Sequence, residues 1–206
     1  MRIVVVDTMG GLGDLLLALP LIEALQRSHP RAELTVVTTA PWHVLLERDD
    51  RIHEVVPVHG RDEAAVVATV PAVLERLRPD LAITTNRQHG LPELLERTAV
   101  RAITNLWRHP PIDERVDLRM LRLLAEDGAI DPGFATLPPR IVLGDDERAE
   151  GRRLLDGITD GTPVLLFPDS GMPVKHWPLT AWEEAVRGLR REGRVPVVVS
   201  LSLIHI

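Results

Sequence analysis

Short apolar stretches typical of β-strands alternate along this chain with amphipathic stretches of helical periodicity. This order predicts parallel α/β sheets whose strands are joined by right-handed helical crossovers. The expected strands are Arg2–Val6, Glu33–Val37, Glu54–Val58, Leu81–Thr85, Arg101–Thr104, Arg140–Leu143, Val164–Phe167 and Val195–Ser200. The expected helices are, approximately, Asp14–Ser28, Glu63–Arg78, Glu114–Glu126, Asp145–Leu155 and Thr180–Arg191. The predicted fold class is therefore α/β.

Two helix starts carry local signals. Asp145 precedes Glu147 and Arg148, which places acidic side chains at the start of a helix. Thr180 is followed three residues later by Glu183, the spacing of a capping box. We expect helices to begin at both positions.

The polar, turn-rich segment at 156–163 predicts a linker between two domains. We expect an N-terminal domain over residues 1–156, a linker over 157–163 and an incomplete second domain over 164–206. The second domain has a single β-α-β pattern, which cannot cover both faces of a parallel sheet. Residues 201–206, Leu-Ser-Leu-Ile-His-Ile, continue the last strand with apolar residues and resemble translated sequencing-adapter sequence. The alternative is a genuine edge strand.

Composition excludes several classes of function. The 206 residues are 45% apolar and carry a net charge of −6, so no general basic field attracts nucleic acid. Met1 and Arg2 lead directly into a strand, and no uncharged apolar run reaches membrane-spanning length, so we expect neither a signal peptide nor a membrane span. The absence of cysteine excludes disulfides and thiolate zinc sites, and the scattered histidines predict no metal site.

A glycine-rich loop follows the first strand and ends at Asp14, where a helix is expected to begin. Glycines allow a sharp turn that brings backbone N–H groups and a positive helix end close to an anion. The dinucleotide fingerprint is not met, because Leu16 stands where its third glycine belongs and Thr39 follows the second strand without an acidic residue. The Walker sequence is also absent. Asp14 could act simply as a helix-capping or first-turn acid, or as a catalytic carboxylate.

Lys175 is the one lysine in the chain, since the other 23 of its 24 basic residues are arginine. It follows an apolar strand, at the place where a loop leads into a helix. A lysine ammonium is a compact, flexible charge that fits between phosphate oxygens, whereas a guanidinium is a planar fork. Lys175 is therefore a candidate phosphate ligand, and the alternative is a lysine on a solvated turn.

Three further groups have weaker functional interpretations. Asp169, Ser170 and His176 suggest a hydrolase triad but lack the surrounding Gly-x-Ser-x-Gly turn. Arg115, Arg119 and Arg122 share one helical face, which could bind an acidic acceptor or anionic lipid, although a solvated face is the simpler interpretation. The loop at 84–90 follows the fourth strand and should face the ligand crevice at the strand ends.

The chain resembles the ADP-heptose:lipopolysaccharide heptosyltransferase family. The run Gly10–Thr38 contains Gly13-Asp14, Leu19-Pro20 and a Pro-x-Ala turn in the order found at the start of these enzymes. The second half matches independently, because Lys175-His176-Trp177-Pro178 has the family's Lys-x-Trp-Pro pattern ahead of a helix. The segment Arg115–Ala129 is similar to the helix that precedes the family's linker, although the 84–90 loop departs from the family.

The resemblance implies a GT-B glycosyltransferase with two Rossmann-like domains, which transfers heptose from an ADP-sugar to a glycan or glycolipid with inversion and without metal or cofactor. It implies a cytoplasmic enzyme with at most peripheral membrane contact and no nucleic-acid partner. Asp14 would be the base; Lys175, Ser170 and Gly171 would bind the donor diphosphate; and Gly11, Gly13, Asn86 and Arg87 would form the acceptor-side loops. Trp177 is expected to pack rather than to stack on a ligand. The alternative is a non-catalytic, Rossmann-type protein that binds a nucleotide or sugar phosphate.

Overall fold

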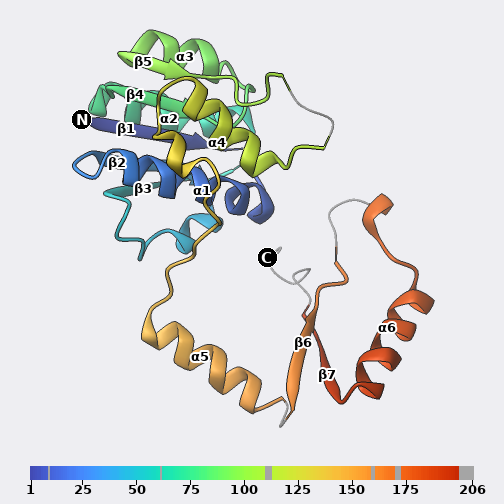
Figure 1. Ribbon diagram of the computed structural model, residues 1–206. Helices are drawn as coiled ribbons and strands as arrows, with labels where there is room; N and C mark the ends of the chain where they lie inside the picture. The colour runs from blue at the N-terminus through green and yellow to red at the C-terminus, as the bar shows by residue number, and fades with distance from the viewer. Residues whose placement is uncertain (9, 61, 110–112, 159–160, 170–172, 200–206) are drawn as a thin grey trace. The chain divides into compact units, whose positions relative to one another are not determined.

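The chain divides into two compact units, Met1–Val142 and Leu143–Ile206. The computed structural model describes residues 1–8, 10–60, 62–109, 113–158, 161–169 and 173–199 (Figure 1). The division precedes the helix α5 (Asp145–Asp156), which the sequence analysis assigned to the N-terminal domain. The domain to which α5 belongs therefore stays a prediction.

A five-stranded parallel sheet forms the centre of the first unit. Its order is β3-β2-β1-β4-β5, so the chain starts in the middle, moves to one edge and then crosses to the other. The strands are β1 (Arg2–Asp7), β2 (Glu33–Thr39), β3 (Glu54–Val58), β4 (Leu81–Thr84) and β5 (Arg101–Ile103). Val4 of β1 pairs with Thr35 on one side and with Ala82 on the other. The direction of winding reverses between β1 and β4, and this switch point is where open α/β sheets bind ligands.

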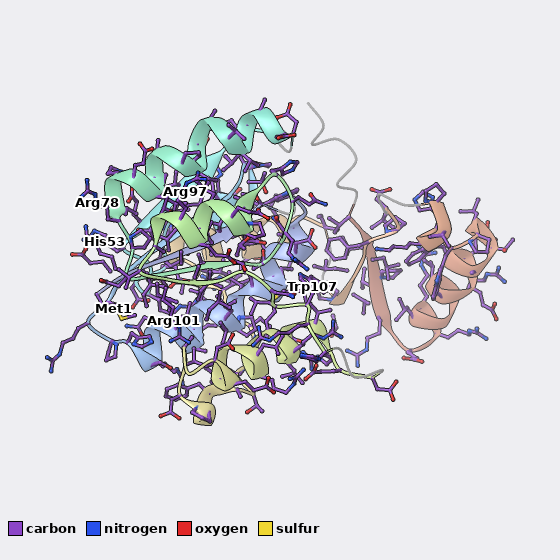
Figure 2. The ribbon with its side chains drawn as sticks, turned by 90° about the horizontal axis from the view of Figure 1, so that it is seen from above. Met1, His53, Arg78, Arg97, Arg101 and Trp107 are labelled. Atoms are coloured by element: carbon purple, nitrogen blue, oxygen red, sulfur yellow. The ribbon has the colours of Figure 1, made fainter. Side chains whose placement is uncertain are left out.

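Helices cover both faces of this sheet, which explains the unbroken apolar run of β1 (Figures 1 and 2). Ile3 and Val5 pack into a core with α1 (Leu12–Ser28) and α4 (Val116–Glu126). Val4 and Val6 point to the opposite face, where the core includes α2 (Glu63–Leu77) and α3 (Leu91–Thr98). All four apolar residues are buried, as their position in the central strand requires.

Several local predictions were wrong. Residues 140–143 form no strand, because the carbonyl oxygen of Arg140 accepts a hydrogen bond from the Arg51 side chain rather than from a sheet neighbour. The short helix α3, which begins after Gly90, was not predicted. By contrast, the predicted helix start at Asp145 is confirmed: α5 begins at Asp145, and its N-cap is Gly144, whose N–H donates to Glu147 Oε2 at 2.7 Å.

The helix α6 (Leu179–Arg191) begins one residue earlier than expected. Its N-cap is Pro178, which has no side-chain acceptor, so the predicted capping box of Thr180 and Glu183 is wrong. A proline before a helix fixes an extended backbone at the cap and needs no donor of its own. The N–H groups in the first turn of α6 therefore have no side-chain cap at this position.

A buried ion cluster fastens the end of the first unit to α1. The Arg51 guanidinium contacts the carboxylates of Glu23 and Asp49 and donates to the Arg140 carbonyl oxygen at 2.9 Å. The side chains of Arg51, Glu23 and Asp49 are 5%, 6% and 1% exposed. Burial alone would raise the pKa of Glu23, but hydrogen bonds from Arg27 and Arg51 lower it overall. The arginines therefore favour the ionised form of Glu23 inside the protein.

Replacing Arg51 with leucine should destabilise the first unit by about 3 kcal/mol, because two buried carboxylates lose their shared cation. Urea denaturation followed by circular dichroism measures this loss. The matched control is Arg76→Leu, which breaks an ion pair with Glu54 whose side chains are 52% and 34% exposed. The control should cost less than about 1 kcal/mol. Equal losses for the two variants would contradict a structural role for the buried cluster.

The second unit contains a β-α-β arrangement. Its strands β6 (Thr162–Leu166) and β7 (Arg194–Val198) are parallel, with Val164 opposite Pro196. The short 3-10 helix η3 (Pro173–Lys175) and α6 connect them. No described residue of this unit is fully buried, and the side chains of Phe167 and Val198 are 52% and 64% exposed. The sheet of this unit has uncovered apolar surface among the described residues.

Candidate functional site

Polar side chains gather at the carboxyl ends of β1 and β4, on either side of the switch point. Asp7 is the last residue of β1 and Thr8 follows it, while Thr85 and Asn86 follow β4; all four are buried. Thr85 Oγ1 donates to Asp7 Oδ1 at 2.6 Å, and Asn86 Nδ2 donates to Thr8 Oγ1 at 3.0 Å. These bonds join the two strand ends. In Figure 2, Met1 marks the edge at which β1 begins, and Trp107 lies toward the opposite edge.

The loop after β1 places Asp14 at the start of α1. Gly11 is the N-cap, and its N–H donates to Asp14 Oδ2 at 3.0 Å. A Cβ atom at Gly11 would lie 2.9 Å from Asp14 Oδ2, so any other residue there would displace the carboxylate. Gly10 has a φ of 112°, and its carbonyl oxygen accepts from Trp42 Nε1 at 3.2 Å. The backbone at Gly10 therefore favours glycine, a side chain at Gly11 would move the Asp14 carboxylate, and nothing lies within 4 Å of a Cβ at Gly13.

Asp14 and Asp7 line the same small pocket. Its other lining residues come from α1, from the end of β4, from the loop after β5 and from α4, and they are Leu17, Thr85, Trp107, Val116 and Met120. Trp107 Nε1 donates to the Thr85 carbonyl oxygen at 2.7 Å, which fixes the indole against the strand end. The pocket thus has two carboxyl groups, and its described lining includes no basic side chain.

Burial raises the pKa of Asp7 to about 6. The hydrogen bond from Thr85 lowers this pKa, and the neighbouring charge of Asp14 raises it further, but desolvation has the largest effect. Sequence reasoning missed Asp7. The available signal was an acidic residue at the last position of an otherwise apolar strand, in a fold that binds ligands at strand ends.

This raised pKa predicts a pH-dependent stability. The folded protein binds the Asp7 proton more tightly than the unfolded chain, so the stabilisation is fully present below pH 3.8 and is lost as the pH rises through about 6. Asp7→Asn should remove this loss, which amounts to about 3 kcal/mol of unfolding free energy. Urea denaturation at several pH values measures the difference between variant and parent. Asp50→Asn, at an 84% exposed side chain, is the control and should leave the pH dependence unchanged.

The loop after β4 is organised by Asn86. Its side-chain oxygen accepts from the Gln88 N–H at 3.1 Å while its amide nitrogen bonds Thr8, so both ends of this amide bind within the protein. Arg87 is exposed next to it. Asn86 therefore positions the loop, and Arg87 presents its guanidinium to solvent.

The arginines of α4 and of its N-cap are paired with carboxylates. Arg119 and Arg122 contact Glu114 at 3.4 and 2.7 Å, and Arg115 contacts Asp117 at 2.6 Å. The Arg119 guanidinium also lies 5.9 Å from the centre of the Trp107 ring. Because these arginines already have carboxylate partners, we interpret this surface as a solvated, ion-paired face. The pairing argues against a surface that binds acidic ligands.

In the second unit, Lys175 lies between β6 and α6. It is the last residue of η3, and it is exposed. Trp177 contacts the Trp182 ring at a centroid distance of 5.1 Å, which supports packing against α6 as its role. Ser170 and Gly171, the other predicted diphosphate ligands, lie outside the described residues, so the suggested triad of Asp169, Ser170 and His176 cannot be assembled from the described part of the chain.

The described residues contain no group of three or more histidine, aspartate or glutamate side chains placed to hold a metal ion. Among the described helices, none is both long and apolar enough to cross a membrane.

Several solved structures have a fold similar to that of this chain. A glycosyl transferase family 9 protein from Veillonella parvula matches with a TM-score of 0.72 and 18% identity, over 96% of this chain and 62% of that one. Escherichia coli ADP-heptose lipopolysaccharide heptosyltransferase II matches with a TM-score of 0.71 and 18% identity, over 96% and 64%. An Escherichia coli heptosyltransferase solved with ADP matches with a TM-score of 0.63 and 18% identity, over 96% and 66%. No protein-family model and no curated protein matches the sequence.

The fold is the GT-B type of α/β fold found in glycosyltransferases. Within that type, the chain has the fold of the family 9 heptosyltransferases, which confirms at the level of the fold the resemblance seen in the sequence. The chain spans less than two thirds of the length of each of these structures.

Proposed function

We propose that this chain belongs to an inverting glycosyltransferase that uses a nucleotide-sugar donor. In this proposal, residues 1–156 form the acceptor domain, 157–163 the linker and 164–206 the first part of the donor domain. The observation that carries the proposal is the carboxylate of Asp14, held by Gly11 at the sheet's switch point in a chain with the fold of solved heptosyltransferases. A carboxylate at this position can take a proton from an acceptor hydroxyl group.

The chemistry needs a base on the acceptor and positive charge on the leaving group. Asp14 removes the acceptor proton, the acceptor oxygen bonds to the anomeric carbon, and the bond from that carbon to the diphosphate breaks. The diphosphate leaves with the electron pair. Lys175 and the N-terminal N–H groups of α6 stabilise its charge, together with Ser170 and Gly171.

The donor we favour is an ADP-sugar with a heptose or a related sugar. Two of the similar structures are described as an ADP-heptose enzyme and as a heptosyltransferase with ADP. A glycan or a glycolipid is the acceptor class, and a cytoplasmic enzyme with at most peripheral membrane contact fits such a substrate. Lys175, which lies between β6 and α6, supports a phosphate-bearing donor, because a compact ammonium can contact oxygens of both phosphates.

A transfer assay tests this proposal in a protein that carries residues 1–199 followed by the remainder of a donor domain. ADP-heptose, other ADP-sugars and UDP-sugars are offered with lipopolysaccharide-core acceptors, and products are detected by mass spectrometry. We expect a glycosidic product with an ADP-sugar, and nuclear magnetic resonance should show that the anomeric configuration has inverted. Tight donor binding without any product would favour the alternative, a non-catalytic binding protein.

A further inference from the structure

Asp7 is a buried carboxyl group for which the chemistry described above has no role. It ends β1, is 3% exposed, and accepts one hydrogen bond, from Thr85 Oγ1 at 2.6 Å. An aspartate at the end of a central, apolar strand costs stability unless it is paired or keeps its proton. Because Asp7 lines the same pocket as the candidate base Asp14, we connect this cost in stability with function.

The pocket that Asp7 lines contains one other acidic group and no basic side chain among its described lining residues. From α1, Asp14 reaches the same pocket. The element β4 contributes threonines, and β2 places Thr38 opposite Asp7. From α4, Arg119 lies over the Trp107 ring but is paired with Glu114.

Among the other charged groups near this edge, Arg87 in the loop after β4 is exposed to solvent. Arg115, the N-cap of α4, is paired with Asp117. On η1 (Trp42–Leu45), His43 lies 3.6 Å from Glu47 and contacts the His59 ring. No ion pair joins a described cation to Asp7, and the charged group that acts on it is the carboxylate of Asp14.

We propose that Asp7 is the proton-accepting partner of Asp14: the proton that Asp14 removes from the acceptor hydroxyl passes through the shared pocket to Asp7, which must be ionised when each turnover starts. This role rests on the proposed function. Asp7 acts through Asp14 and does not itself touch the substrate.

The proton balance of this step is simple. The acceptor O–H bond breaks and an O–H bond forms on Asp14, while the diphosphate leaves with its electron pair. The O–H bond on Asp14 then breaks, one forms on Asp7, and Asp14 is again a carboxylate. Asp7 later releases the proton to solvent. Burial without a cation favours the proton on Asp7, and its raised pKa, about 6, is close enough to neutrality for both uptake and release.

Carbon-13 nuclear magnetic resonance of aspartate carboxyl groups tests the pair in the 206-residue chain itself. We expect one carboxyl signal to titrate near pH 6 and to disappear in Asp7→Asn. Asp14→Asn should lower the titration midpoint of Asp7, because it removes a neighbouring charge. Thr85→Val should raise that midpoint, because it removes the hydrogen bond that favours the ionised form. A midpoint near 3.8, or one that Asp14→Asn leaves unchanged, would overturn the proposal.

The pH profile of sugar transfer separates the proton-accepting role from a purely structural one. In a protein with a whole donor domain, kcat should fall below pH 6 in the parent, and Asp7→Asn should lower the plateau by roughly tenfold and remove that limb. An acid limb retained in Asp7→Asn would contradict the role. If no sugar is transferred at all, the proposed function fails, but the carboxyl titrations still decide whether the two groups form a pair.

Discussion

Asp14→Asn is expected to lower the rate of sugar transfer by roughly 100- to 10,000-fold, the usual range for the loss of a general base. Asparagine has nearly the same size and can still accept the hydrogen bond from the Gly11 N–H that caps α1. It cannot accept the substrate proton. Initial rates at saturating donor and acceptor, measured in a protein with a whole donor domain, give the size of the effect.

The thermal midpoint of Asp14→Asn should stay close to that of the parent. The matched control is Asp131→Asn, which changes the N-cap of the 3-10 helix η2 (Pro132–Phe134), where the Asp131 side chain accepts from the Gly133 N–H at 2.8 Å. The control should transfer sugar at the parental rate. If donor binding by Asp14→Asn is lost in step with the rate, Asp14 organises the loop and another group is the base.

Lys175→Ala is expected to reduce the transfer rate by about 100- to 1,000-fold, because one preorganised charge is removed from the leaving diphosphate. Lys175→Arg should recover only part of this loss, since the planar guanidinium cannot occupy the same point between phosphate oxygens. The measurement is kcat for parent and variants with the same ADP-sugar, together with ADP affinity from calorimetry.

Arg152→Ala is the control for a general charge effect, because Arg152 is an exposed cation on α5 of the same unit. Its removal should change the transfer rate less than twofold, as screening at physiological salt weakens exposed charges. Turnover of Lys175→Ala close to the parental value would show that the lysine does not contact the diphosphate.

The strands and longer helices of the first unit could be predicted because their sequence patterns are local. The strand β1 is a run of four apolar residues, and α1 repeats leucines at helical spacing. The helix α3 was missed because it is only 8 residues long. The segment at 140–143 has the composition of a strand, but its position depends on Arg51, 89 residues away in sequence, and no local pattern reveals that bond.

The candidate site could likewise be predicted only where its signal is local in the sequence. Asp14 follows a glycine loop, a signal contained within five residues of sequence. The importance of Asp7 depends on burial by Thr85 and Trp107, which lie 78 and 100 positions further along the chain. A pKa that is set by desolvation depends on the packed structure, so sequence alone could indicate an acidic residue at a strand end but not its protonation.

The anchoring of Arg140 has a mechanical consequence. Its carbonyl oxygen is bonded to Arg51, and its guanidinium lies 3.4 Å from Glu23 Oε2 on α1. A force applied to the chain after residue 140 therefore acts on the middle of α1 and not on its N-terminal turn. The segment that leads out of the first unit is thus attached to α1 at Glu23, nine residues beyond Asp14, and not at the turn that carries the Asp14 carboxylate.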